Sequence, residues 1–305
     1  MRKYVILLCS CFLLPAHANQ KIITSETFST CQRIAKKLAS VSLKECLHIN
    51  PQTSGWFSRQ GTPILIKEYP PLKNKTAQAK ILLIGGTHGD ELSSVSVTFK
   101  WMQKLEKYHS GLFHWRVVPM MNPDGVLKKR ATRTNANGVD LNRNLPSPSW
   151  DKLALKYWQT KTKKNKRRYP GPTAASEPET QWLVDEINTF QPNVIISVHA
   201  PLRLVDFDSD NLKQAPRRIG PLRRNLMGTY PGSLGNYAGR YLDIPVMTLE
   251  LPHGGIMPSK QQITHLWVDL VRWLKKNAHK PDIKVMQPAL NKQTETGIPD
   301  YSLNQ

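Results

Sequence analysis

The chain has 305 residues, and 39% of them are hydrophobic. At roughly 100–200 residues per domain, this length supports one sizeable core and excludes several independent ones. The formal net charge of +21 at pH 7 indicates an anionic substrate or partner, and nucleic acid belongs to that class until other features exclude it.

Residues 1–18 have the pattern of a signal peptide. Arg2 and Lys3 give a positive start, residues 5–14 are apolar, and Ala18 ends a small-residue cleavage site. An uncleaved membrane anchor is the alternative, but the apolar run is shorter than the ~20 residues that span a bilayer. We therefore expect export, a periplasmic location and no stable membrane span after cleavage.

Cysteine usage agrees with export. Cys9 and Cys11 would leave with the signal peptide, whereas Cys31 and Cys46 would remain. An even pair in an exported chain predicts a disulfide. Two free buried thiols are the alternative, because sequence spacing alone does not establish disulfide geometry.

Residues 19–62 are expected to be an N-terminal lead-in and not a separate domain. They contain a short helical pattern around residues 31–38. A strand pattern follows at residues 64–69 and ends at the consecutive prolines 70–71.

Four later apolar runs have the character of strands: residues 80–84, 115–121, 193–198 and 245–251. Each is short and is bounded by Gly, Pro or Asn. Near-continuous apolar strands indicate a sheet that is covered on both faces.

Helical patterns lie between and after these strands: residues 91–107, a segment capped by Ser176, and residues 263–274. In the middle segment, Pro178 would lie in the first turn and Glu179 would complete a capping box. We expect an α/β fold, a single domain with a mostly parallel mixed sheet flanked by helices, over residues 63–275. A polar tail is expected at residues 276–305.

A loop of glycine, histidine and carboxylate residues follows the first of these four strands. In residues 85–91 the glycines permit a sharp turn, and His88 and Glu91 are spaced to converge on one point. A catalytic zinc site needs three protein ligands and an open position, and His199 at the end of a later strand is the third candidate. Two other histidines compete for this role: His114 and His253.

Glu250 also ends an apolar strand, where a carboxylate is costly unless it faces a cleft or has a partner. Zinc lowers the pKa of a bound water towards about 7, and a carboxylate within hydrogen-bond reach accepts the proton as that water attacks a carbonyl. We expect Glu250 to be this general base.

Arginine and amide side chains are concentrated in residues 133–146. Arg133 and Arg143 can bind a carboxylate or stabilise a developing oxyanion, with the Asn142 amide as a nearby donor. The alternative is a network of turns in which Asn and Asp side chains bond to local backbone groups.

These motifs, in this order, resemble the zinc carboxypeptidase (funnelin) family. Residues 88–91 match its metal motif, Asn142 and Arg143 its Asn-Arg signature, and His199 its last ligand. The resemblance is strongest to the murein peptide amidase branch, through residues 122–125, 135–146, 176–180 and 197–199.

The resemblance implies these roles: one zinc ion on His88, Glu91 and His199, the base at Glu250, and a substrate-carboxylate clamp of Asn142 and Arg143. Arg133 would polarise the scissile carbonyl, although Arg130 competes for that role. The family's mobile tyrosine lies four residues before the glycine that matches Gly232, where this chain has Gly228. Tyr230 is displaced from that position, so it either fills the role by another route or the role is absent.

The same resemblance implies hydrolysis of the bond between γ-linked D-glutamate and meso-diaminopimelate in peptidoglycan stem peptides, either murein tripeptide or longer. The carboxylates of this substrate suit the positive charge of the chain. Asp206 and Asp208 could meet the diaminopimelate amine, but we expect exposed aspartates that balance nearby arginines.

Two rival functions follow from the same residues. A deacylase of N-acyl amino acids, of the aspartoacylase or succinylglutamate desuccinylase type, has a comparable metal motif and Asn-Arg pair. A non-enzymatic protein could bind an anionic polymer through the basic run at residues 161–168 and the arginines Arg217, Arg218, Arg223 and Arg224. Nucleic acid is not expected, because the basic runs lack regularly interleaved aromatic residues and because the export signal and the metal-ligand set indicate another function.

Overall fold

The computed structural model describes residues 23–279. The signal peptide expected at residues 1–18 lies outside this range, as does most of the expected tail. The α-helices are α1 (Ser25–Lys37), α2 (Leu43–Ile49), α3 (Leu92–Tyr108), α4 (Pro123–Leu127), α5 (Trp150–Thr160), α6 (Pro178–Phe190) and α7 (Lys260–Asn277). No helix in the described part of the chain is both long enough and apolar enough to cross a bilayer.

Within residues 23–279, nine strands form one sheet in the order β1-β2-β4-β3-β5-β9-β6-β8-β7. They are β1 (Gln52–Phe57), β2 (Pro63–Tyr69), β3 (Ala79–Ile84), β4 (Phe113–Val118), β5 (Val194–His199), β6 (Leu204–Asp208), β7 (Arg218–Ile219), β8 (Leu222–Arg224) and β9 (Val246–Glu250). The central pairs β4–β3, β3–β5 and β5–β9 are parallel, whereas β2–β4 and β9–β6 are antiparallel. The expected α/β fold with a mixed sheet flanked by helices is confirmed.

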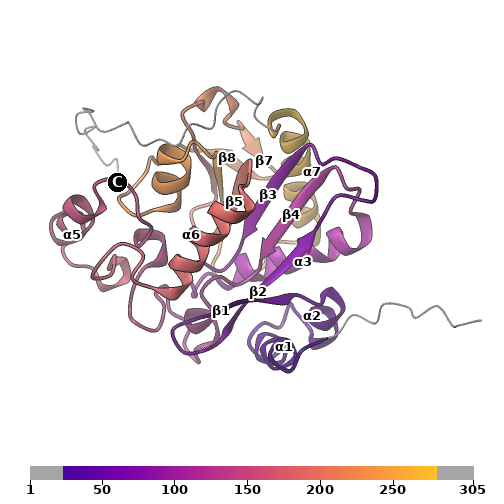
Figure 1. Cartoon of the computed structure of the whole chain (residues 1–305), viewed down its shortest axis with the longest axis horizontal. Helices are drawn as coiled ribbons and strands as arrows, with labels where there is room; N and C mark the ends of the chain where they lie inside the picture. The colour runs from indigo at the N-terminus through magenta and orange to yellow at the C-terminus, as the bar shows by residue number, and fades with distance from the viewer. Residues whose placement is uncertain (1–22, 280–305) are drawn as a thin grey trace, which may run out of the picture.

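The sheet is buried on both faces, as the apolar strands indicated. Side chains of β3 alternate, so that Ile81 and Leu83 belong to one core cluster while Leu82 and Ile84 belong to the other. The first cluster lies against α3 and α7, and the second lies against α6. Figure 1 shows α6 on one side of the sheet and α3 and α7 on the other.

The N-terminal segment packs onto the edge of this sheet and shares its core. β1 pairs antiparallel with β2, and α1 and α2 bury Ile34 and Ile49 in the first core cluster. A disulfide between Cys31 and Cys46 joins the two helices. In Figure 1, α1 and α2 lie together beside β1 and β2.

The start of α6 differs from the expected capping box. Its N-cap is Glu177, with no side-chain cap, because Ser176 Oγ accepts a hydrogen bond from Asn144 Nδ2 (3.0 Å) and donates to Glu177 Oε1 (2.9 Å). The Glu179 carboxylate accepts from Asn135 Nδ2 (3.2 Å). These side chains therefore fasten the helix to residues 133–146, and the local box does not form.

The carboxyl ends of β3, β5 and β9 meet at one edge of the sheet. The chain leaves β3 for β4 on one side and returns to β5 on the other, so a topological switch point lies between β3 and β5. Crevices in open α/β sheets form outside such strand ends. The polar residues that follow these three strands are brought together there.

Candidate active site

The loop after β3 turns tightly against the loop after β4. A Cβ at Gly89 would overlap the backbone carbonyl carbon of Gly125, so glycine is required for this approach. Asn122 ties the two loops to a third segment, because its Nδ2 lies 3.4 Å from the Thr87 carbonyl and 3.2 Å from the Arg133 carbonyl. This packing directs the side chains of the loop after β3 inward.

Two histidines and one glutamate converge at this edge of the sheet. His88 Nδ1 lies 2.8 Å from Glu91 Oε1, and His199 Nδ1 lies 3.0 Å from Glu91 Oε2. The two Nδ1 atoms are 3.1 Å apart, and among the described residues these three side chains are the cluster able to hold a metal ion. Ligands at ~2.0–2.1 Å in a tetrahedron around zinc lie roughly 3.3 Å apart, so the donor atoms fit that ion.

The outer contacts of the two imidazoles also fit a metal site. His88 Nε2 lies 3.1 Å from Asp140 Oδ1, and His199 Nε2 lies 2.9 Å from Ser197 Oγ. Histidine ligands usually bond through their second nitrogen to such a group, which fixes the ring and its tautomer. Both Nδ1 atoms are thereby left to face the Glu91 carboxylate.

The electrostatics of the cluster favour a cation. Burial opposes ionisation of Glu91, but His88 and His199 overcome it and hold the pKa of that carboxyl well below its usual range. Burial and Arg133 work against protonation of His88, yet Glu91 and Asp140 raise its pKa. The negative charge of Glu91 and Asp140 is thus concentrated on one buried point.

Glu250 lies directly beside His199. The two residues are register partners in the parallel strands β9 and β5, and Glu250 is buried, with Oε2 3.4 Å from the Leu202 backbone nitrogen. Burial raises the pKa of Glu250, and the nearby Glu91 carboxylate adds to the rise, whereas His199 opposes it. A raised pKa suits a carboxylate that must accept and return a proton near neutral pH.

Arg143 and Tyr230 form a second group. The Arg143 guanidinium lies over the Tyr230 ring, with Cζ 4.4 Å from the ring centroid. Arg143 Nη1 donates to the Asn142 carbonyl (2.6 Å), while its buried Nε has no partner among the described residues. A buried guanidinium with a free donor is suited to an incoming carboxylate.

Asn142 is fixed beside this group. Its Oδ1 accepts a hydrogen bond from the Leu234 backbone nitrogen (2.8 Å), which leaves the amide nitrogen as the donor. The expected clamp residues Asn142 and Arg143 are thus adjacent, and Tyr230 covers the arginine.

Arg133, and not Arg130, lies beside the candidate metal ligands. Arg133 Nε donates to Asp140 Oδ2 (2.9 Å), and its Nη1 lies 3.5 Å from Glu91 Oε1. Arg130 is exposed. The competing histidines are also elsewhere: His114 Nε2 lies 2.7 Å from Glu68 at the start of β4, and His253 is exposed.

Asp206 and Asp208 are buried, so their expected exposure is wrong. They lie on β6 on the same face as Glu250, and they are 3% and 8% exposed. Asp206 Oδ1 accepts from the Met227 backbone nitrogen (3.0 Å), whereas Asp208 has no hydrogen-bond or ion-pair partner among the residues described. Burial and mutual repulsion raise the pKa of Asp208, although Arg240 opposes the rise.

Two residues of this site had no assigned role in the sequence interpretation. Asp140 joins His88 to Arg133, and Ser197 holds the ring of His199. Both are visible within the motifs of the chain, because Asp140 precedes the Asn142-Arg143 pair and Ser197 is two residues before His199. For Asp140, the sequence alone did not show the contact with His88 from another loop.

Comparison with known proteins agrees with this geometry. Residues 49–218 match the family described as zinc carboxypeptidase. The chain is 33% identical to murein peptide amidase A of Escherichia coli (strain K12) over 207 residues, which cover 66% of this chain and 82% of that protein. It is 30% identical to murein peptide amidase A of Vibrio campbellii over 230 residues, covering 74% and 88%.

A solved structure supports the same relationship. The murein-tripeptide amidase of Escherichia coli O157 aligns with a TM-score of 0.54 at 28% identity, covering 76% of this chain and 93% of that one. Thrombin activatable fibrinolysis inhibitor aligns with a TM-score of 0.62 at 17% identity, covering 82% and 72%, and at that identity it shows the fold alone.

Proposed function

The chain belongs to the zinc carboxypeptidase family, whose members are hydrolytic enzymes, and from this premise we propose that it cleaves the γ-D-glutamyl–meso-diaminopimelate bond of peptidoglycan stem peptides. The observation that carries the proposal is the convergence of His88, Glu91 and His199 beside Glu250, next to a buried arginine with a free donor. The names of the relatives support this choice of substrate, because they describe amidases of murein peptides.

Glu250 moves the proton in the proposed reaction. A zinc ion held by His88, Glu91 and His199 would supply Lewis acidity, which makes water nucleophilic and polarises a carbonyl. Glu250 accepts the proton of the attacking water and then donates it to the amine of the leaving residue. Its raised pKa allows both steps.

The two arginines have separate tasks. Arg133 directs its guanidinium towards Glu91, so it can donate to the oxygen on which negative charge develops. Arg143 and Asn142 bind the terminal carboxylate of the leaving residue, and Tyr230 packs against that arginine. Binding at this clamp places the last amide bond of the substrate at the metal ligands.

The buried acids on β6 support diaminopimelate as the leaving residue. This residue has an ammonium group on its side chain besides the terminal carboxylate. Asp206 interacts electrostatically with Glu250, and Asp208 has no basic partner within hydrogen-bonding distance in the described chain. An ammonium group bound on this side of Glu250 would compensate the two carboxylates.

Export to the periplasm is part of the proposal. The signal pattern of residues 1–18 supports it. The disulfide between Cys31 and Cys46 also supports it, because such bonds persist in oxidising compartments.

Mass spectrometry of a defined substrate tests the function. Purified protein is incubated with L-Ala-γ-D-Glu-meso-diaminopimelate, with and without a zinc chelator. We expect release of diaminopimelate that the chelator abolishes and added zinc restores. Absence of release from this peptide, together with hydrolysis of N-acyl amino acids, would replace the proposal with the deacylase function.

A further inference from the structure

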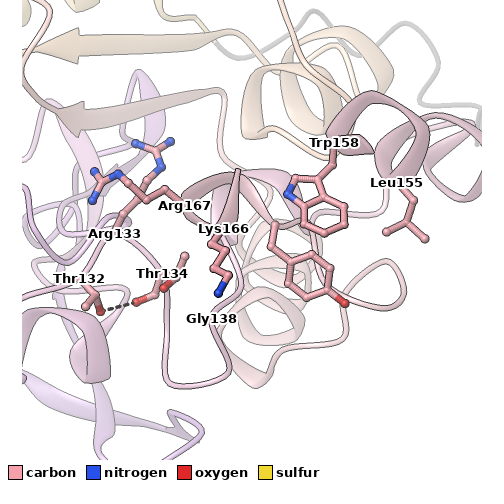
Figure 2. Close-up of a pocket in the computed structure, with 9 residues that line it drawn as sticks. Thr132, Arg133, Thr134, Gly138, Leu155, Trp158, Lys166 and Arg167 are labelled. Carbon is pink, nitrogen blue, oxygen red and sulfur yellow. Dashed lines mark hydrogen bonds between the residues drawn. The ribbon is translucent and has the colours of Figure 1, made fainter. Parts of the chain in front are cut away.

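A cavity of about 620 Å³ opens beside Arg133, away from the carboxylate clamp. Its walls come from the segment around Arg133 and from the excursion that contains α5 and the 3₁₀ turn Lys166–Arg168. The lining residues are Thr132, Arg133, Thr134, Gly138, Leu155, Trp158, Lys166, Arg167 and Tyr169, and Figure 2 shows them around the opening.

One wall of the cavity is apolar and held in place. The rings of Trp158 and Tyr169 contact each other, with centroids 4.9 Å apart. Trp158 Nε1 donates to the Asn165 carbonyl (2.8 Å), which ties the end of α5 to the basic run that follows. The aromatic wall and the basic residues are therefore one local unit.

The cavity also has three cationic side chains, and two of them are already paired. Arg133 bonds to Asp140, and Arg167 Nη1 lies 2.7 Å from Asp90 Oδ2. Lys166 has no hydrogen-bond or ion-pair partner anywhere in residues 23–279. It is therefore the cation of this cavity that is free to bind an anion.

The position of the cavity identifies the part of the substrate that would enter it. Arg133 belongs both to the cavity and to the metal-ligand cluster. None of the residues that face the leaving residue lines the cavity, since Arg143, Tyr230 and Glu250 are absent from its walls. A substrate fixed by its leaving residue at the clamp would extend its acyl part past Arg133 into this space.

We infer that this cavity binds the acyl residue of the substrate and that Lys166 pairs with a free carboxylate on it. The inference rests on the proposed function. A γ-linked glutamyl residue uses its side-chain carboxyl in the scissile amide, so its α-carboxylate stays free. An ordinary α-linked residue has no carboxylate at that place, and Lys166 would therefore favour the γ-linked isomer.

Two substrates that differ only in this carboxylate test the inference. One is L-Ala-γ-D-Glu-meso-diaminopimelate, and the other has D-isoglutamine in place of D-glutamate, so a carboxamide replaces the α-carboxylate. We expect the wild-type enzyme to have a KM for the acid about fivefold lower than for the amide, as suits a partly exposed ion pair. Lys166→Met should remove that preference by raising the KM for the acid while leaving the amide unchanged.

Lys161→Met is the matched control. Lys161 belongs to the same basic run and is also exposed, but it does not line the cavity. This variant should keep the wild-type preference, and Lys166→Arg should restore it. The inference is overturned if Lys166→Met still prefers the acid substrate to the amide, or if Lys161→Met loses that preference equally. In either case, cleavage by the wild type still upholds the proposed function. Failure of the wild type to cleave either substrate overturns the proposed function and the inference with it.

Discussion

The sheet itself holds Glu250 next to the candidate metal ligands, because Glu250 pairs in register with His199. We predict that Glu250→Gln keeps the metal and loses turnover, since the amide fills the same space but cannot accept a proton. The loss in kcat should be roughly 10²–10⁴-fold. Metal content measured by mass spectrometry and cleavage of murein tripeptide check the two parts of this prediction.

His88→Ala is the comparison for that experiment. It removes one of the three donors, so metal content and activity should fall together. Normal cleavage by Glu250→Gln would show that another group is the base.

Arg143 should show the opposite kinetic effect, because in the proposed function it binds the substrate and does not take part in proton transfer. Its buried Nε has no hydrogen-bond partner among residues 23–279, and a hydrogen bond to a charged group contributes about 1.5–3 kcal/mol. We predict that Arg143→Ala raises KM roughly 10–100-fold with a smaller effect on kcat. Kinetics with a C-terminal carboxamide substrate provide the control, because the wild type should lose affinity for it and the variant should not. An unchanged KM in Arg143→Ala contradicts the clamp.

The site residues were largely predictable because each one follows a recognisable strand or lies within a motif. His88 and Glu91 lie in the loop after one apolar strand, His199 and Glu250 end two others, and strand ends of this kind meet at one edge of a sheet. Contacts between loops were not predictable. Strand neighbours were not predictable either: β6 pairs with β9 and carries Asp206 into the interior, so the exposure expected for that residue was wrong.

At the scale of elements, apolar runs predicted the strands better than cap residues predicted a helix start. The runs at residues 80–84 and 193–198 agree with β3 and β5 to within one residue at each end. The Ser176 side chain, in contrast, accepts a hydrogen bond from Asn144 in a neighbouring loop and does not cap the helix N-terminus. A hydrophobic pattern reflects burial over several residues, whereas one polar side chain can bond to any of several neighbours.

The disulfide between α1 and α2 gives a prediction at this scale. Cys31 and Cys46 are 15 residues apart, and closing a loop of that length stabilises a fold by about 3 kcal/mol. We predict that Cys31→Ala/Cys46→Ala lowers the free energy of unfolding by about this amount and leaves kcat/KM unchanged, because α1 and α2 belong to the core cluster on the other face of the sheet from Glu250. Urea unfolding followed by circular dichroism checks the stability.

A reducing agent is the control for this measurement. It should lower the stability of the wild type to that of the double variant and leave the variant unaltered. Equal stability of the oxidised wild type and the double variant would contradict the prediction.

The whole molecule has a net charge of +21, yet two aspartates of β6, Asp206 and Asp208, are buried near the π-helical segment Gly235–Tyr241. Asp208 packs against Gly235 and Gly239, where a Cβ would overlap its side chain. Among the residues described, Arg240 is a cation whose charge opposes the rise in the pKa of Asp208. When no ligand is bound, we expect the folded protein to keep a proton on these buried aspartates, because a buried carboxylate without a cationic partner is costly.

This arrangement predicts how the stability of the whole protein depends on pH. Burial and Asp206 raise the pKa of Asp208 to about 8, so the folded state keeps a proton that the unfolded chain releases near pH 4. The free energy of unfolding contributed by this group therefore falls as pH rises from about 4 to about 8. Asp208→Asn carries no such proton, so its melting temperature should rise relative to that of the wild type between pH 5 and pH 9.

Asp210→Asn is the control, because it removes the same charge from an exposed side chain that pairs with Arg240 at 3.3 Å. Thermal unfolding of both variants and the wild type should show a pH-dependent gain for Asp208→Asn alone. If Asp208→Asn is destabilised equally at pH 5 and pH 9, its carboxyl is ionised over this whole range and is compensated by a partner. Asp208 would then be one half of a structural ion pair with a cation such as Arg240, and its support for an ammonium-bearing leaving residue would be lost.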